Sequence, residues 1–198
     1  MLAHGAGGGQ TSVFMVQAAR ELPARGITVA TFDFPYMAAG RRPPDKAPVL
    51  EAHWRAVIDH VRGREEVAGL PLFIGGKSMG GRIASQVAAG GAAGIAGLIF
   101  FGYPLHPPGR PEQRRDAHLP AIRVPMLFIQ GSRDQFGAAA ELRALLPRRD
   151  HAAVLVEIGD GDHSFKTRLK VTGRKPDTAL IDVFDAAAAF IRRQAGRS

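Results

Sequence analysis

Short apolar runs alternate with longer amphipathic stretches along this chain. The apolar runs are rich in β-branched and aromatic residues, which is typical of buried strands, and comprise residues 27–32, 70–75, 95–101, 124–130 and 153–158. The amphipathic stretches carry apolar residues at helical spacing and comprise residues 12–22, 49–64, 82–89, 138–146 and 178–194. Strands that alternate with helices in this order predict an α/β fold, a mostly parallel sheet with helices on both faces.

Two segments interrupt this alternation. Residues 37–48 are rich in Gly, Pro and Arg and predict a loop, and residues 102–120 predict a second, longer polar loop. Neither segment marks a shift in composition that would divide the chain, so we expect a single domain over residues 1–198.

The composition is that of an ordinary globular protein, with 45% hydrophobic and 22% charged residues. No apolar run approaches the roughly 20 residues of a membrane-spanning helix, so no membrane partner is expected. The first residues show neither the basic nor the apolar region of a secretory signal, which favours a cytoplasmic location. Because the chain has no cysteine, disulfides and thiolate metal sites are excluded.

The charge is strongly positive, with a formal net charge of +8. The basic residues are dispersed, and their densest groups are the pairs Arg41-Arg42, Arg114-Arg115, Arg148-Arg149 and Arg192-Arg193. None of these pairs forms a basic run, and no aromatic residues lie between them as a stacking platform would require. We therefore attribute the charge to an Ala/Arg/Gly-biased composition and expect no nucleic-acid partner.

One pentapeptide, Gly76-Lys77-Ser78-Met79-Gly80, matches the G-x-S-x-G nucleophile elbow. In such an elbow the serine lies on a strained turn from a strand to a helix, and small neighbours let that turn close. The predicted strand 70–75 and helix 82–89 flank the motif in the order that the elbow requires. Ser78 is therefore the candidate nucleophile.

A nucleophilic serine needs a base, and the base needs an acid to orient it. Asp134 follows the strand 124–130, and His163 follows the strand 153–158. Both lie beyond the carboxyl ends of their strands, so they reach the same edge of a parallel sheet as Ser78. His106 also follows a strand, but it precedes the candidate acid in the sequence, and we favour His163 as the base.

The remaining polar residues have simpler interpretations. Asp160 and Asp162 are predicted to cap the turn before His163. His53, His60, His118 and His151 are expected to be solvated, and no metal site or other cofactor is expected.

Developing negative charge on an acyl oxygen needs backbone donors. The N–H group of Met79 supplies one by its position after the nucleophile. The glycine-rich loop from His4 to Gly9 is expected to supply the second, from Ala6 or Gly7, with Ala6 preferred. This loop matches neither a dinucleotide-binding fingerprint nor a P-loop, which excludes a phosphate-binding interpretation.

With these motifs in place, the chain resembles the α/β-hydrolase superfamily over nearly its full length. It is most similar to small cap-less hydrolases related to dienelactone hydrolases, a branch that includes the testis-expressed and nonspecific-lethal-complex-subunit-like proteins. The resemblance is carried by Ala3-His4-Gly5-Ala6-Gly7, Phe34-Pro35-Tyr36, Arg41-Arg42-Pro43-Pro44-Asp45, Gly75-Gly76-Lys77-Ser78-Met79-Gly80-Gly81-Arg82, Tyr103-Pro104-Leu105-His106-Pro107, Gly131-Ser132-Arg133-Asp134 and Asp162-His163-Ser164-Phe165. Lys77, before the nucleophile, points to this branch. The resemblance implies a hydrolase and names no substrate.

The amino-terminal end departs from the family pattern. Members of this fold usually begin with one or two strands more before the oxyanion loop, whereas residues 1–3 leave room for a short strand only. We therefore expect about six strands, without the leading antiparallel ones, unless the native start lies upstream. A sheet edge exposed in this way favours a homodimer.

Together these features predict a serine hydrolase that acts on a small ester, thioester or lactone through an acyl-enzyme. The loop 102–120 is the expected wall of the substrate pocket, and the pocket candidates are His4, Gly7, Lys77, His106 and Arg110. A non-catalytic protein-interaction module on a hydrolase scaffold is the alternative. Peptidase or haloperoxidase-like chemistry stays open.

Overall fold

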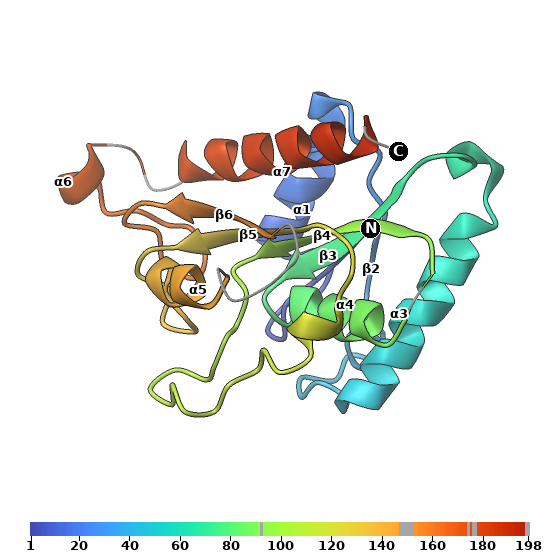
Figure 1. Cartoon of the computed structure of the whole chain (residues 1–198), viewed down its shortest axis with the longest axis horizontal. Helices are drawn as coiled ribbons and strands as arrows, with labels where there is room; N and C mark the ends of the chain where they lie inside the picture. The colour runs from blue at the N-terminus through green and yellow to red at the C-terminus, as the bar shows by residue number, and fades with distance from the viewer. Residues whose placement is uncertain (92, 147–152, 174, 176–177, 197–198) are drawn as a thin grey trace.

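The computed structural model describes residues 1–91, 93–146, 153–173, 175 and 178–196. Its centre is a six-stranded sheet in the order β2-β1-β3-β4-β5-β6 (Figure 1). The strands are β1 (Leu2–Ala3), β2 (Thr31–Phe32), β3 (Leu72–Lys77), β4 (Ile95–Phe101), β5 (Met126–Gly131) and β6 (Ala153–Ile158). All of their pairings are parallel, which confirms the predicted α/β class with a mostly parallel sheet.

Helices cover both faces of the sheet (Figure 1). One face is covered by α1 (Val13–Glu21) and α7 (Ala179–Ala195), and the other by α3 (Ala47–Arg62), α4 (Met79–Ala89) and α5 (Ala139–Leu145). Two short helices, α2 (Pro35–Ala38) and α6 (Leu169–Thr172), lie in the connections. On the first face Met15 and Phe184 pack in one core, and on the second Trp54 and Ile83 pack in another. All four side chains are buried, so each helix owes its place to an apolar stripe that faces the sheet.

The predicted strand 27–32 is mostly wrong, because only Thr31–Phe32 forms a strand. The reason is its partner: β2 lies at the edge of the sheet and pairs with β1, which offers just Leu2 and Ala3. An extended segment without a neighbour cannot form the ladder hydrogen bonds that define a strand.

The predicted loop 37–48 is also partly wrong. A helical turn occupies Pro35–Ala38, and α3 already begins at Ala47, with Pro48 in its first turn. Proline suits that position because the first N–H groups of a helix have no partner within the helix. Within the residues that the structure describes, no helix combines the length and the apolar character needed to cross a membrane.

Candidate active site

Ser78 lies on the turn between β3 and α4, and its backbone has the strained angles φ 51° and ψ −117°. A non-glycine residue with positive φ is uncommon and marks a turn that the surrounding structure must hold in place. The helix starts directly after it, at Met79. A Cβ on Gly80 would lie 2.3 Å from the carbonyl oxygen of Ala3, so only glycine lets α4 approach β1 this closely.

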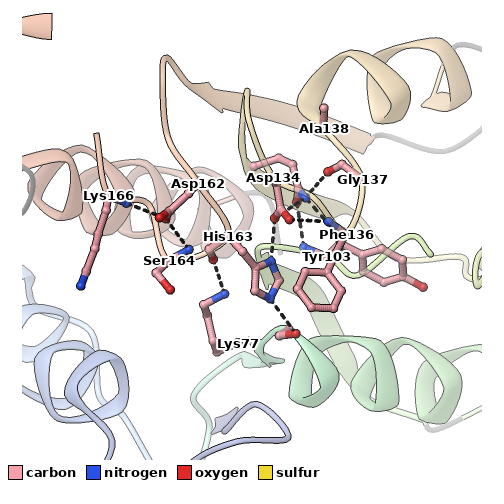
Figure 2. Close-up of polar contacts among 12 residues, drawn as sticks. Lys77, Tyr103, Asp134, Phe136, Gly137, Ala138, Asp162, His163, Ser164 and Lys166 are labelled. Carbon is pink, nitrogen blue, oxygen red and sulfur yellow. Dashed lines mark hydrogen bonds and ion pairs between the residues drawn. The ribbon is translucent and has the colours of Figure 1, made fainter. Parts of the chain in front are cut away.

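His163 bridges Ser78 and Asp134. Its Nε2 is 2.9 Å from the Ser78 Oγ, and its Nδ1 is 2.7 Å from Oδ2 of Asp134 (Figure 2). An ionised carboxylate accepts a hydrogen bond, so Nδ1 carries the proton and Nε2 is free to accept the hydroxyl proton of Ser78. The three side chains come from the ends of three strands, β3, β5 and β6. The structure therefore brings together the three residues that the motifs single out.

Asp134 is held by a buried amide that the sequence analysis missed. The Gln130 side chain donates from Nε2 to Oδ2 of Asp134 at 2.9 Å and to the carbonyl of Gly137 at 2.6 Å. Its Oε1 accepts the N–H of Tyr103 at 2.7 Å, and the backbone N–H of Phe136 donates to Oδ1 of Asp134 at 2.8 Å. The sequence gives one indication of this role, because Gln130 is a single polar residue at the end of the otherwise apolar predicted strand 124–130.

The loop that carries His163 is braced from both sides. The Asp162 carboxylate accepts the backbone N–H groups of Ser164 and Lys166, at 2.8 and 2.9 Å, which confirms its predicted turn-capping role. The Phe136 ring packs on the imidazole with centroids 4.3 Å apart. Phe165 is fully buried and has φ of 64°, which anchors the loop in the core. The base is thus fixed in orientation before any substrate arrives.

The loop after β1 runs beside the nucleophile. A Cβ on Gly5 would lie 3.6 Å from the Cβ of Ser78, and the Tyr36 hydroxyl donates to the carbonyl of Ala6 at 3.1 Å. The buried His4 ring accepts the N–H of Phe34 at Nε2, so its Nδ1 carries the proton that it donates to the Gly5 carbonyl. Burial lowers the pKa of His4, although the Gly5 hydrogen bond and the charge of Asp33 oppose it. Two side chains therefore fix the carbonyls of this loop, and with them the direction of its N–H groups.

The other residues predicted to line the substrate pocket lie in different surroundings. The Nζ of Lys77 donates to the backbone carbonyl of His163, and burial lowers the pKa of this ammonium to about 8, against the opposing charges of Asp134 and Asp162. His106 is buried, and its ring nitrogens contact the Glu141 carboxylate and the Pro107 carbonyl. Arg110 is exposed, and a Cβ on Gly7 would meet no atom within 4 Å.

The expectation for the remaining histidines is partly wrong. His53 is half-buried and contacts the carbonyl of Asp33, and His118 contacts the Ser85 hydroxyl at 2.7 Å. His60 is exposed as expected, and His151 lies outside the described residues. In the part of the chain that the structure describes, no group of three or more His, Asp or Glu side chains is arranged to hold a metal ion.

A cavity of about 390 Å³ lies at the opposite edge of the sheet. It is lined by residues that include Leu22 at the end of α1, Val29 from the segment before β2, and Leu72 and Phe73 from the amino-terminal end of β3. Ser78 follows the carboxyl end of β3, so this cavity is no part of the site described above.

Solved structures of hydrolases and esterases share this fold. A serine hydrolase without a lid from Xanthomonas campestris superposes with a TM-score of 0.72 at 26% identity, over 96% of this chain and 77% of that one. A dienelactone hydrolase from Anabaena variabilis superposes with a TM-score of 0.72 at 20% identity, over 97% of this chain and 84% of that one. Est1E from Butyrivibrio proteoclasticus superposes with a TM-score of 0.72 at 17% identity, over 98% of this chain and 86% of that one.

The sequence itself matches a family model described as an alpha/beta hydrolase domain, over residues 1–192. This match spans all six strands and every residue of the Ser78, His163 and Asp134 arrangement. Membership of the testis-expressed branch stays a prediction. The chain belongs to the α/β-hydrolase family.

Proposed function

We propose that this protein is a serine hydrolase that cleaves small esters, thioesters or lactones through an acyl-enzyme on Ser78. The observation that carries the proposal is the position of the His163 imidazole, within hydrogen-bond distance of both the Ser78 hydroxyl and the Asp134 carboxylate. Such an arrangement makes a serine nucleophilic at neutral pH, which an isolated hydroxyl is not.

The reaction proceeds in two halves. The Ser78 Oγ attacks the acyl carbon while Nε2 of His163 takes its proton, and Asp134 stabilises the imidazolium that forms. The N–H groups of Met79 and Ala6 donate to the oxyanion of the tetrahedral intermediate. The imidazolium then protonates the leaving alcohol, thiol or lactone oxygen, and the acyl group stays on Ser78. In the second half water attacks the ester, His163 takes a proton from that water and returns it to Ser78, and the acid is released.

Small substrates suit the form of the site. The His163 side chain is 18% exposed although the acid beside it is buried, so the nucleophile opens to solvent. The segment between β4 and β5 is closed on itself, with the Tyr103 hydroxyl donating to the Arg115 carbonyl and the Arg115 N–H donating to the Leu105 carbonyl. Short acyl groups fill an open site of this kind, and long chains would gain little burial there.

A fluorophosphonate probe tests the proposal directly. We expect the folded wild-type protein to be labelled at Ser78 at neutral pH, and we expect Ser78→Ala to lose both labelling and ester turnover. Ser12→Ala, at the amino-terminal end of α1, is the matched control and keeps both. Asp134→Asn should slow labelling by roughly 10³-fold, because an amide no longer holds the imidazole in the required tautomer.

A panel of p-nitrophenyl esters, thioesters and lactones then ranks substrates by kcat/KM. If the folded wild-type protein neither labels nor turns over any of them, the proposal is wrong. Together with a stable protein partner, that outcome would favour the non-catalytic interaction module.

A further inference from the structure

Lys77 joins the nucleophile elbow to the loop that carries the base. It is the last residue of β3, directly before Ser78. Its Nζ donates to the backbone carbonyl of His163 at 2.5 Å (Figure 2). The same atom lies 5.4 Å from the centroid of the Phe165 ring. A single side chain thus contacts two residues of the base loop across 86 positions of sequence.

The ammonium group of Lys77 has no ion pair among the residues that the structure describes. The nearest carboxylates are committed elsewhere: Asp134 accepts His163 and Gln130, and Asp162 accepts the N–H groups of its own turn. Lys77 is half-buried, and taking a lysine even partly out of water without a carboxylate partner costs hydration that a hydrogen bond to a carbonyl does not fully return. The lowered pKa of Lys77 agrees with this cost. A charge kept in an unfavourable place near an active site suggests a role there.

The ammonium is also close to the imidazole. Gly102, which follows β4, has φ of 68°, and a Cβ on it would lie 2.9 Å from the Lys77 Nζ and 3.3 Å from Nδ1 of His163. Both nitrogens therefore border the same glycine, and Lys77 holds the base loop directly beside the imidazole.

We propose that Lys77 is a positioning residue for the reaction of Ser78: its ammonium group fixes the His163 carbonyl and so holds the imidazole where its Nε2 can accept the serine proton. This inference rests on the proposed function. The hydrogen bond ties the strand that ends at the nucleophile to the loop that carries the base, so the distance between Oγ of Ser78 and Nε2 of His163 depends on it.

The test compares Lys77→Met, which keeps the length of the side chain without its charge, with Lys77→Arg, which keeps a cation. Lys46→Met, at the exposed amino-terminal end of α3, is the control. Rates are expressed per site titrated with the fluorophosphonate, so that unfolded protein does not count. For K77M we expect kcat about 10- to 100-fold lower with KM within about twofold, because the base is misplaced while the substrate pocket is kept.

Rescue by a second donor separates positioning from simple structural support. K77R, which can still donate to the His163 carbonyl, should recover most of the wild-type kcat, and K46M should keep it. A structural role alone would lower the melting temperature and leave kcat per titrated site unchanged. If K77M does not fold, Lys77→Leu, which also lacks a donor, should show the same loss of kcat.

The outcomes also separate this inference from the proposed function. If Ser78 of the wild type is not labelled, the proposed function fails and the role of Lys77 fails with it. If the wild type is labelled but K77M keeps the wild-type kcat per site, the role of Lys77 alone is overturned.

Discussion

Replacement of Gln130 by Met should weaken the fold and the active site together. This side chain is fully buried and forms hydrogen bonds to three residues at once, Tyr103, Gly137 and Asp134. Methionine has nearly the same length and volume but neither donates nor accepts these bonds. The change therefore tests the polar network while leaving the packing almost unchanged.

The expected magnitude follows from the bonds that are lost. Each hydrogen bond between neutral groups contributes about 1 kcal/mol, and one to a charged group contributes about 1.5–3 kcal/mol. Gln130 makes neutral bonds to Tyr103 and Gly137 and one bond to the Asp134 carboxylate. We expect the free energy of unfolding to fall by about 3–5 kcal/mol, a large share of the roughly 5–15 kcal/mol typical of a domain.

Urea denaturation followed by circular dichroism measures this change, with Gln113→Met, at an exposed position, as the control. The rate of fluorophosphonate labelling should fall about tenfold under conditions where Q130M is still folded. The reason is that Asp134 loses one of the hydrogen bonds that orient its carboxylate toward His163. A loss of stability below about 1 kcal/mol, with labelling unchanged, would refute the view that Gln130 supports the acid.

Three further outcomes are expected. Gly80→Ala should cost about 2–3 kcal/mol of stability in thermal melts, because the new Cβ would lie 2.3 Å from the Ala3 carbonyl oxygen, whereas Gly7→Ala should cost almost nothing. The free energy of unfolding of the wild type should fall as the pH drops below 6.5, because burial lowers the pKa of His4 and the unfolded chain then binds the proton better. His4→Gln should reduce the difference in unfolding free energy between pH 5 and pH 7, measured by urea titration. The pKa of Lys77 is about 8 in the folded protein against 10.5 ordinarily, so the unfolded chain binds this proton better. Between pH 7.5 and 10.5 the free energy of unfolding of the wild type should therefore rise by up to about 3 kcal/mol relative to that of K77M. Equal dependence of the unfolding free energy on pH in the two proteins would contradict this.

The fold followed from the pattern of apolar residues wherever a strand has a long neighbour to pair with. The strands predicted at residues 95–101 and 153–158 appear with the same bounds, because they have neighbours long enough to pair with. The segment 27–32 has the same β-branched composition, yet only Thr31–Phe32 pairs. Local sequence indicates an extended conformation, but the length of a strand also depends on its partner, and that partner lies at Leu2–Ala3.

The motifs at Ser78, Asp134 and His163 were visible because each has a fixed place relative to a strand. Gln130 was missed since its importance comes from contacts with Tyr103 and Gly137, which no local pattern records. Lys77 was expected near the substrate, and the structure places its Nζ on the carbonyl of His163 instead. The roles of Gln130 and Lys77 both depend on contacts between segments that are distant in the sequence.

The distance in sequence between Ser78 and its base has a consequence for how the enzyme is made. The elbow is held by β1, β3, β4 and α4, since the Ser78 N–H donates to the Phe101 carbonyl, so it can form once about the first half of the chain has left the ribosome. His163 lies 85 residues further along and reaches Ser78 only after β6 has docked on β5. With Ser78 as the nucleophile that we propose, a growing chain carries its serine in place but without a proton acceptor, and it does not attack cellular esters during synthesis. Labelling of Ser78 in chains of increasing length should begin only when residue 163 is free to fold.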